Sequence, residues 1–212
     1  MNETLIKSQT VIVADGNFPG HEIPLGYIRN AERIICCDGS AENVLKAGYI
    51  PEAIVGDMDS LTEDMASRFA DRLFINKGQD TNDLTKAVEW CRSKYYIDLV
   101  IVGATGKRED HTIGNISLLA DYASKVNVQM VTDTGIFRPF LESCTISSFP
   151  GQKISLFSID PETDIKSTGL KYPLANVKIS NWWIATLNEA LEDSFSLEFS
   201  NGRVIVYLKF KE

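Results

Sequence analysis

Apolar runs and amphipathic segments alternate through the first part of the chain. Runs typical of buried strands occupy residues 10–16, 33–40, 53–57, 72–76, 98–104 and 126–133. Between them, helical spacing or capping residues predict helices over residues 40–48, 60–70, 80–91 and 110–123. Strands that alternate with helices in this way form a parallel sheet with helices on both of its faces. We therefore predict an α/β fold with a doubly wound, mainly parallel N-terminal sheet.

Single residues define the expected helices further. Four apolar positions fall at i, i+3, i+4 and i+7 and would share one buried helical face: Leu84, Ala87, Val88 and Cys91. Ser40 is placed to cap the helix that ends near Gly48. Ser60, followed three residues later by Glu63, has the spacing of a capping box at the start of the next helix.

The pattern changes near residue 140. Residues 152–159, 177–180 and 195–210 are typical of strands, and no long helix lies between them. Asn201 and Gly202 separate two alternating runs, which indicates a β-hairpin. We predict two domains, an α/β domain over residues 1–139 and a smaller, sandwich-like all-β domain over residues 140–212.

Composition and charge argue against several classes of protein. The 212 residues are 44% hydrophobic, which is enough for a sizeable core. The net charge of −8 argues against a nucleic-acid groove, which needs concentrated positive charge, and against docking on anionic lipid. No apolar run approaches the roughly 20 residues that a membrane span needs.

The N-terminal residues and the cysteines predict a cytoplasmic protein. Residues 1–10 lack the basic and apolar regions of a signal peptide. The four cysteines form no CxxC motif, and the adjacent Cys36 and Cys37 have poor geometry for a disulfide, so we expect reduced thiols. Because the chain has only two histidines, any metal site would hold a hard cation between carboxylates.

Carboxylates follow one predicted strand after another, at the end where ligands bind in open α/β sheets. These strand-end residues are Asp15, Asp38, Asp57, Asp59, Asp80, Asp83 and Asp110. Most also have a simpler explanation when taken alone: Asp80 as a helix N-cap, Asp83 as a favourable first-turn charge, and Asp38 as part of a turn.

As a group, these aspartates predict a cation site. Two carboxylates ~4 Å apart repel each other by about 4 kcal/mol at an effective dielectric constant near 20. A divalent cation removes this repulsion, and Mg²⁺ is the usual choice where phosphates complete its coordination. Lys86 and Arg108 lie among the aspartates and are placed to neutralise phosphate oxygens, whereas Lys107 is typical of a solvated loop charge.

Five ordered segments carry a family resemblance: "CDGSAENVL", "VGDMDS", "GQDTNDLTKA", "GATGKREDH" and "STGLKYPL". From about residue 11 to its end, the chain resembles the thiamine pyrophosphokinase family. The resemblance implies Mg²⁺-dependent transfer of the pyrophosphoryl group of ATP to the hydroxyl of thiamine, giving thiamine diphosphate and AMP. It also implies a homodimer with a shared active site, a nucleotide-binding α/β domain, and a β domain for thiamine binding and dimerisation.

The resemblance also implies the site residues. The implied metal ligands are Asp57, Asp59, Asp80 and Asp83. The implied ATP- and phosphate-binding residues are Asp38, Ser60, Gln79, Asp80, Lys86, Arg108 and Asp110. The implied catalytic residues are Asp57, Asp59, Asp83 and Arg108. Asp57 or Asp59 is our first choice for accepting the proton of the attacking hydroxyl, but the sequence does not separate a base from a metal ligand.

The chain departs from the family pattern on the thiamine side. Leu187 stands where the family has a serine, directly before Asn188. The resemblance therefore leaves Asn188 and Thr186 as thiamine-binding residues, without the usual hydroxyl.

Two further departures lie in the α/β half. Asn82 stands where the family usually has threonine, and Ser40 or Lys107 stands where it has a second glycine. Of the adjacent Trp182 and Trp183, one is expected to face the core, and either could meet the cationic thiazolium of thiamine.

Two alternatives remain open at this point. A haloacid-dehalogenase-like phosphatase would use Asp57 as nucleophile and Asp59 as acid, although that pair normally follows the first strand of its fold. A non-catalytic nucleotide- or metal-sensing module would explain the acidic loops, but it gives no reason for Lys86 and Arg108 among them.

Overall fold

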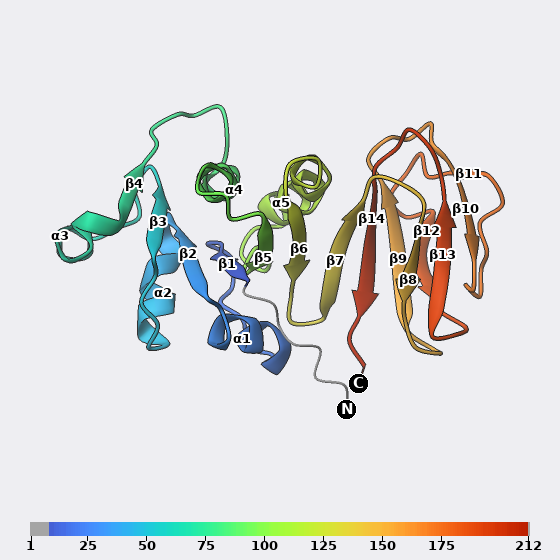
Figure 1. Cartoon of the computed structure of the whole chain (residues 1–212), viewed down its shortest axis with the longest axis horizontal. Helices are drawn as coiled ribbons and strands as arrows, with labels where there is room; N and C mark the ends of the chain where they lie inside the picture. Colours follow the sequence, from blue (N-terminus) through green and yellow to red (C-terminus); the bar gives the residue numbers. More distant parts are fainter. Residues whose placement is uncertain (1–8, 212) are drawn as a thin grey trace. The chain divides into compact units, whose positions relative to one another are not determined.

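The computed structural model describes residues 9–211, which form two compact units (Figure 1). The first unit contains the residues up to 115 together with residues 125–133, and the second contains residues 116–124 and the residues from 134 onward. Most of the N-terminal stretch inspected for a signal peptide lies outside the described residues. Among those described, no helix is long and apolar enough to cross a membrane.

The first unit is built on a parallel sheet in the order β6-β5-β1-β2-β3-β4. Its strands are β1 (Thr10–Val13), β2 (Arg33–Cys37), β3 (Ala53–Gly56), β4 (Leu73–Ile75), β5 (Asp98–Val102) and β6 (Asn127–Val131). Its helices are α1 (Glu22–Arg29), α2 (Ala41–Lys46), α3 (Glu63–Arg68), α4 (Asp83–Ser93) and the first half of α5 (Glu109–Tyr122), with short 3₁₀ turns at Asp38–Ser40 and Ala70–Arg72. The central strands are buried throughout, as continuous apolar runs in a parallel sheet require.

The strand order places helices on both faces of this sheet. The chain steps from β1 to β4 in one direction and then returns to β5 and β6 on the other side of β1. Since crossovers between parallel strands are right-handed, α1 and α2 cover one face and α4 the other, as Figure 1 shows. The prediction of a doubly wound parallel sheet is therefore confirmed.

The predicted core face of α4 is also confirmed, because its four apolar residues are at most 4% exposed. Two predicted helix caps are wrong. Ser40 makes no capping hydrogen bond; it is buried, and its Oγ donates to the Val13 carbonyl at 2.7 Å, which ties β1 to the end of β2. Thr62, rather than Ser60, caps α3 by accepting a hydrogen bond from the Met65 N–H.

The second unit contains two antiparallel sheets. One has the order β12-β9-β14-β7 and the other β11-β10-β13-β8. The strands are β7 (Gly135–Phe140), β8 (Cys144–Ser147), β9 (Lys153–Ser158), β10 (Asp164–Thr168), β11 (Val177–Lys178), β12 (Ala185–Glu189), β13 (Ser194–Glu198) and β14 (Val204–Lys209). Buried residues of both sheets, including Leu156, Ile165 and Phe195, form one hydrophobic cluster, so this unit is the predicted β-sandwich.

The predicted hairpin at Asn201 and Gly202 is wrong. β13 pairs with β8 and β10, whereas β14 pairs with β7 and β9, so the turn carries the chain from one sheet to the other. A Cβ atom on Gly202 would come within 2.3 Å of the Thr163 hydroxyl. The glycine therefore serves a close approach of the backbone at the edge of the sandwich rather than a two-stranded turn.

The domain boundary expected at residues 139 and 140 stays a prediction. The compact units divide between residues 133 and 134, because β7 pairs along its whole length with β14. Residues 116–124, which include the second half of α5, are also grouped with the second unit.

Candidate active site

Three carboxylates from three elements meet at the carboxyl end of the parallel sheet. Asp38 follows β2, Asp57 follows β3, and Asp83 is the first residue of α4. Each offers one oxygen, and these oxygens lie within 4.8 Å of one another. The parallel sheet explains the meeting, because neighbouring parallel strands end at the same edge.

Gly56, the last residue of β3, makes room for the carboxylates. A Cβ atom at this position would lie 2.8 Å from Cβ of Asp38 and 3.4 Å from Cγ of Asp83. Any larger residue would therefore push the acidic side chains apart. The chain then continues through Met58, whose φ of 69° turns the backbone directly after Asp57.

Asp38 occupies the most buried position of the three, with 3% of its surface exposed. Burial, together with the neighbouring charges of Asp83 and Asp57, raises its pKa to about 6, while a hydrogen bond from the Ser60 N–H opposes the rise. Its Oδ2 accepts this hydrogen bond at 3.3 Å, whereas its Oδ1 is buried and has no partner. A buried carboxylate oxygen without a partner is costly, and a cation would satisfy it.

Lys86 balances part of this negative charge. Its ammonium lies 2.9 Å from Oδ1 of Asp83, one turn earlier on α4, and its side chain is only 4% exposed. An ammonium this deeply buried needs an anion beside it, which Asp83 provides. This ion pair therefore holds the Asp83 carboxylate at the N-terminus of α4.

A cavity of about 370 Å³ is lined by Asp57 and Asp83 of this group, and all its lining residues belong to the first unit. Its charged lining residues are Asp15, Asp57, Asp83, Lys86, Lys107 and Arg108. The cavity lies where the strand order reverses, between the loops that follow β1 and β5, which is the usual ligand position in an open α/β sheet.

The loops after β1 and β5 are tied tightly together beside this cavity. The Gly16 N–H donates to the Gly103 carbonyl at 2.6 Å, and the Asn17 N–H donates to the Thr105 carbonyl at 2.8 Å. A Cβ atom on Gly16 would come within 2.4 Å of both carbonyl oxygens, so only glycine fits there.

Lys107 is an exposed loop residue, as expected, but its charge is paired. Its Nζ lies 2.8 Å from Oδ1 of Asp15, and both residues line the cavity. Arg108 also lines the cavity, with its guanidinium in a two-point contact with the Asp110 carboxylate. This contact lowers the pKa of Asp110 to about 2. Lys107 and Arg108 are thus exposed cations that line the cavity, and each is paired with a carboxylate.

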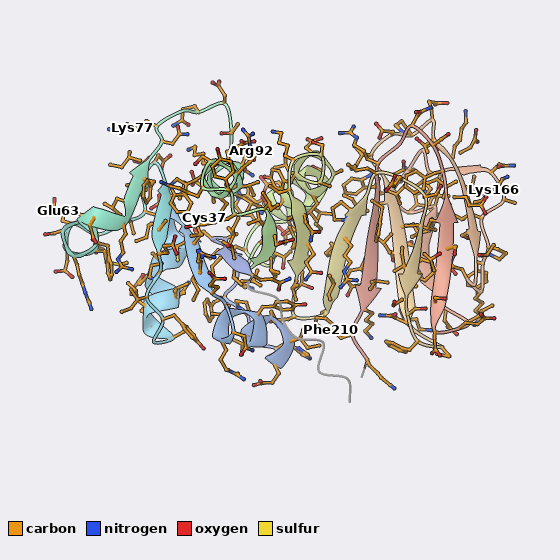
Figure 2. The ribbon with its side chains drawn as sticks, in the orientation of Figure 1. Cys37, Glu63, Lys77, Arg92, Lys166 and Phe210 are labelled. Atoms are coloured by element: carbon orange, nitrogen blue, oxygen red, sulfur yellow. The ribbon has the colours of Figure 1, made fainter. Side chains whose placement is uncertain are left out.

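The other predicted site residues lie around this centre. Gln79 lines the cavity, and the backbone N–H of Ser60 reaches Asp38. Asp59 and Asp80 are exposed, and neither belongs to the group of three carboxylates. The backbone N–H of Asp59 donates to Oδ1 of Asp57 at 3.2 Å, so the residue that follows Met58 is held close to the cluster. Gln79 and Asp80 belong to the loop between β4 and α4, on which Figure 2 labels Lys77.

Asp80 is not the N-cap of α4. Asn82 caps this helix by accepting a hydrogen bond from the Thr85 N–H at 2.9 Å. The Asn82 amide also donates to Asn115, whose own amide donates to the Ala104 carbonyl at the end of β5. The three residues connect the start of α4 to the loop after β5 across the cavity.

The sequence analysis missed several lining residues of the first unit. Asp15 was recognised as a strand-end aspartate but was given no role, and His111 and Asn115 were not considered. A helical signal could have found these two, because positions 111 and 115 are spaced i, i+4 and share one face of α5.

Two family descriptions and several curated relatives match this chain. The family descriptions "Thiamin pyrophosphokinase, catalytic domain" and "Thiamin pyrophosphokinase, substrate-binding domain" match residues 25–132 and 135–207. A curated relative, the thiamine pyrophosphokinase of Bacillus subtilis, is 30% identical over 206 residues, covering 92% of this chain and 95% of the relative. The chain belongs to the thiamine pyrophosphokinase family. It is accordingly a transferase.

Solved structures of the same family share the fold. The crystal structure of a family protein from Enterococcus faecalis matches with a TM-score of 0.81 at 20% identity, covering 97% of this chain and all of the other. The Bacillus subtilis thiamine pyrophosphokinase matches with a TM-score of 0.77 at 25% identity, covering 96% of this chain and all of the other. These findings do not favour the phosphatase or the sensing module.

The residues expected on the thiamine side, Asn188 and Thr186, both make hydrogen bonds to backbone groups of the second unit. Asn188 is 2% exposed, and its amide is used by the backbone of the second unit. Its Oδ1 accepts hydrogen bonds from the Tyr172 and Glu189 N–H groups, and its Nδ2 donates to the Tyr172 carbonyl at 2.8 Å. Thr186 donates its hydroxyl to the Trp183 carbonyl at 2.8 Å.

Leu187, which stands where the family has a serine, lies on an exposed β-bulge. The register of β12 against β9 shifts between Ala185 and Asn188, and Leu187 there has a φ of 58° and is 85% exposed. Of the two tryptophans, Trp182 is half-buried, packs against the ring of Phe157 and donates its indole N–H to the Ser158 carbonyl, whereas Trp183 is 71% exposed. Neither belongs to the hydrophobic cluster of the sandwich.

Proposed function

We propose that this chain transfers the pyrophosphoryl group of ATP to the hydroxyl of thiamine in a Mg²⁺-dependent reaction that yields thiamine diphosphate and AMP. The observation that carries the proposal is the carboxylate cluster. Three aspartates meet beside a cavity lined by Lys86, Lys107 and Arg108, and one buried oxygen of Asp38 has no partner. The carboxylates suit a magnesium ion, and the lysines and the arginine suit the phosphate oxygens that the ion leaves unneutralised.

The residues present fit a hard dication. All three clustered groups offer carboxylate oxygen, which Mg²⁺ prefers, and Gly56 keeps space between them. We propose Asp38, Asp57 and Asp83 as the residues that hold it. Asp59 and Asp80, expected as ligands from the resemblance, remain proposed for a state in which substrate is bound. When bound, Mg²⁺ supplies Lewis acidity and a template for the phosphate oxygens.

The protein's own residues would mainly position the reactants and neutralise charge. The thiamine oxygen forms a bond to the β-phosphorus of ATP, the bond from that phosphorus to the α-phosphate oxygen breaks, and AMP leaves with the electron pair. The hydroxyl proton passes to a carboxylate, for which Asp57 and Asp59 are the proposed acceptors. Lys86 and Arg108 are proposed to offset negative charge on the transferred group, with Ser60, Gln79 and Asp110 placing the nucleotide.

Thiamine binding is proposed for the second unit together with dimer formation. Trp183 and Leu187 leave large apolar surfaces exposed in the single chain, and an aromatic face can also bind the thiazolium cation. Asn188 and Thr186 are proposed to act through the backbone segments that they hold. We also propose a cytoplasmic homodimer, consistent with the free cysteines, three of which are buried.

Product identification tests the proposed reaction. Purified protein mixed with ATP, Mg²⁺ and thiamine is expected to yield AMP and thiamine diphosphate in equal amounts by chromatography. Formation of ADP would indicate a simple kinase instead, and release of inorganic phosphate alone would support the phosphatase. Removal of divalent cations with EDTA is expected to stop turnover, and added Mg²⁺ is expected to restore it.

Sedimentation equilibrium tests the proposed dimer. The mass expected is twice that of one chain, and Leu187→Asp is expected to shift the equilibrium toward the monomer. Tyr95→Asp is a matched control, because Tyr95 is 88% exposed but belongs to the first unit. A monomer at all concentrations would remove the dimer from the proposal without affecting the reaction.

A further inference from the structure

A second cavity, of about 500 Å³, lies between β4 and α4 in the first unit. Strands β3 and β4 supply one wall and α4 supplies the other. The apolar lining residues are Val55, Leu73, Phe74, Ile75 and Trp90. Asn76, Thr81 and Thr85 add polar groups at its border. A mostly apolar cavity with a few polar groups is typical of a small-molecule site.

This cavity adjoins the one above the carboxylates. Thr81 and Lys86 line both cavities, and the Lys86 ammonium lies 2.9 Å from Asp83. A molecule whose phosphates lie at the carboxylate cluster can therefore extend past Lys86 into the second cavity.

The aromatic residues of the wall suit a planar ring. The rings of Phe74 and Trp90 lie 4.8 Å apart between their centroids, and Ile75 is 58% exposed beside them. Base rings stack readily on such side chains. The indole nitrogen of Trp90 is buried without a hydrogen-bond partner, and the ring nitrogens of a purine are hydrogen-bond acceptors.

The charges around the cavity distinguish between the two aromatic substrates. Lys94 lies 5.7 Å from the Trp90 ring centroid and Lys86 lines the wall. Glu89 is the one carboxylate among the described lining residues. One of its oxygens lies 2.7 Å from the Lys125 ammonium, and the other lies 2.7 Å from the Arg92 guanidinium. Cationic surroundings disfavour the permanent charge of a thiazolium ring, whereas a neutral purine is accommodated.

We propose that the cavity between β4 and α4 binds the purine base of the nucleotide whose phosphates lie at Asp38, Asp57 and Asp83. The inference rests on the proposed function, since it assumes that a nucleotide is a substrate. It assigns Phe74, Ile75 and Trp90 to base binding.

Calorimetric titration of the intact protein tests this assignment without relying on turnover. The probes are AMP, ribose 5-phosphate, which lacks the base, and inorganic pyrophosphate with Mg²⁺. Ile75→Asp places a charge at the exposed edge of the cavity. Ile97→Asp is the matched control, because Ile97 is 55% exposed but precedes β5 at the opposite end of the strands.

Ile75→Asp is expected to weaken AMP binding at least fivefold, and to leave the Kd values of ribose 5-phosphate and of pyrophosphate within twofold. Ile97→Asp is expected to change none of them. If Ile75→Asp proves unstable by thermal melting, Ile75→Ala carries the same test with an expected loss of more than twofold.

The possible outcomes separate the two proposals. Normal AMP binding by Ile75→Asp would overturn the base site and leave the proposed reaction intact. Loss of thiamine binding instead of AMP binding would assign the cavity to the other substrate and also overturn it. A wild-type protein that binds neither AMP nor pyrophosphate would overturn the proposed function, and the base site with it.

Discussion

The two units of this chain use their polar residues in opposite ways. In the first unit, Asp38, Asp57 and Asp83 converge at one sheet edge, and an oxygen of Asp38 is buried without a partner. In the second unit, Asn188 is equally buried, but its amide is used by the backbone around Tyr172. An unpartnered oxygen within a group of carboxylates is typical of a ligand site, whereas the fully used amide of Asn188 indicates a structural role.

The difference follows from the two kinds of sheet. In a parallel sheet, every strand brings its carboxyl end to one edge, so residues far apart in sequence meet there without help from side chains. In the antiparallel sandwich, neighbouring strands end at opposite edges, and polar residues such as Asn188 serve to hold a β-bulge or a loop. The predictions below test this contrast.

The largest effect is expected for Asp57→Asn. Removing a charge from the cluster should lower kcat/KM by about 10²–10³-fold, the loss typical of a deleted electrostatic contact in an active site. The melting temperature should stay close to that of the wild type, because repulsion between the carboxylates falls. Steady-state kinetics and thermal melts check both expectations.

Asp59→Asn belongs to the same experiment, with Asp64→Asn on α3 as the exposed control. We expect Asp59→Asn to fold normally and to lose activity, as the family resemblance implies. Near-normal turnover by Asp59→Asn would restrict the essential carboxylates to the three that the structure brings together.

Asn188→Ala should destabilise the protein by roughly 2–3 kcal/mol, since it removes a buried amide that bonds to the backbone of Tyr172 and Glu189. Chemical denaturation measures this loss, and the KM for ATP should not change. The control is Asn181→Ala, whose exposed side chain accepts a hydrogen bond from the Trp183 N–H at 3.3 Å. Unchanged stability of Asn188→Ala, combined with a raised KM for thiamine, would make Asn188 a ligand contact and remove the contrast between the units.

Lys86→Met should destabilise the protein by about 2 kcal/mol, because it leaves the Asp83 charge beside two other carboxylates. Excess Mg²⁺ should recover part of this loss, since a cation at the cluster replaces the missing ammonium. Denaturation with and without Mg²⁺ provides the measurement. Lys46→Met removes an exposed ion pair with Glu42 on α2 and should change stability by less than about 0.5 kcal/mol. Equal losses in the two variants would show that Lys86 is not balancing a buried cluster.

The smallest effect is expected in the second unit, at Asp160. Its carboxylate accepts hydrogen bonds from the Arg203 guanidinium and backbone N–H, which lower its pKa below the usual value. The stabilisation is therefore present above the unfolded-state pKa of about 4 and is lost as the pH falls through the folded-state pKa.

Asp160→Asn should lower the free energy of unfolding by about 1 kcal/mol at neutral pH, with allowance for solvent screening at a residue about a third exposed. The difference from the wild type should shrink as the pH approaches about 3. Denaturation across this pH range checks the prediction, with exposed Glu192→Gln as the control. A difference that stays constant with pH would show that the loss is not electrostatic.

Much of the fold could be predicted from the sequence. The apolar runs gave every strand of the parallel sheet, and the spacing of Leu84, Ala87, Val88 and Cys91 gave the buried face of α4. Helix α1 was missed because its apolar periodicity is interrupted by Pro24 and Gly26. The hairpin at Asn201 was wrong because a local turn signal does not specify which strands pair on either side of it.

The candidate site was predicted in its composition but not in its detail. Strand-end position identified Asp38, Asp57 and Asp83, yet it also selected Asp59 and Asp80, which are exposed. The positive φ of Met58 turns the backbone between Asp57 and Asp59, so a DxD spacing alone does not determine which carboxylate faces a cavity. Asp15 and Lys107 lie 92 positions apart, and no sequence pattern indicated that they pair.

The sequence by itself determined the alternation of strands and helices, the acidic strand ends and the order of the family motifs, because each depends on neighbouring residues. Only the tertiary structure decided which aspartates come together, that Lys86 is buried against Asp83, and that the Asn188 amide bonds to the backbone rather than to solvent. Those outcomes depend on distances between residues that are remote along the chain. Such distances are set by strand order and packing, which no local pattern encodes.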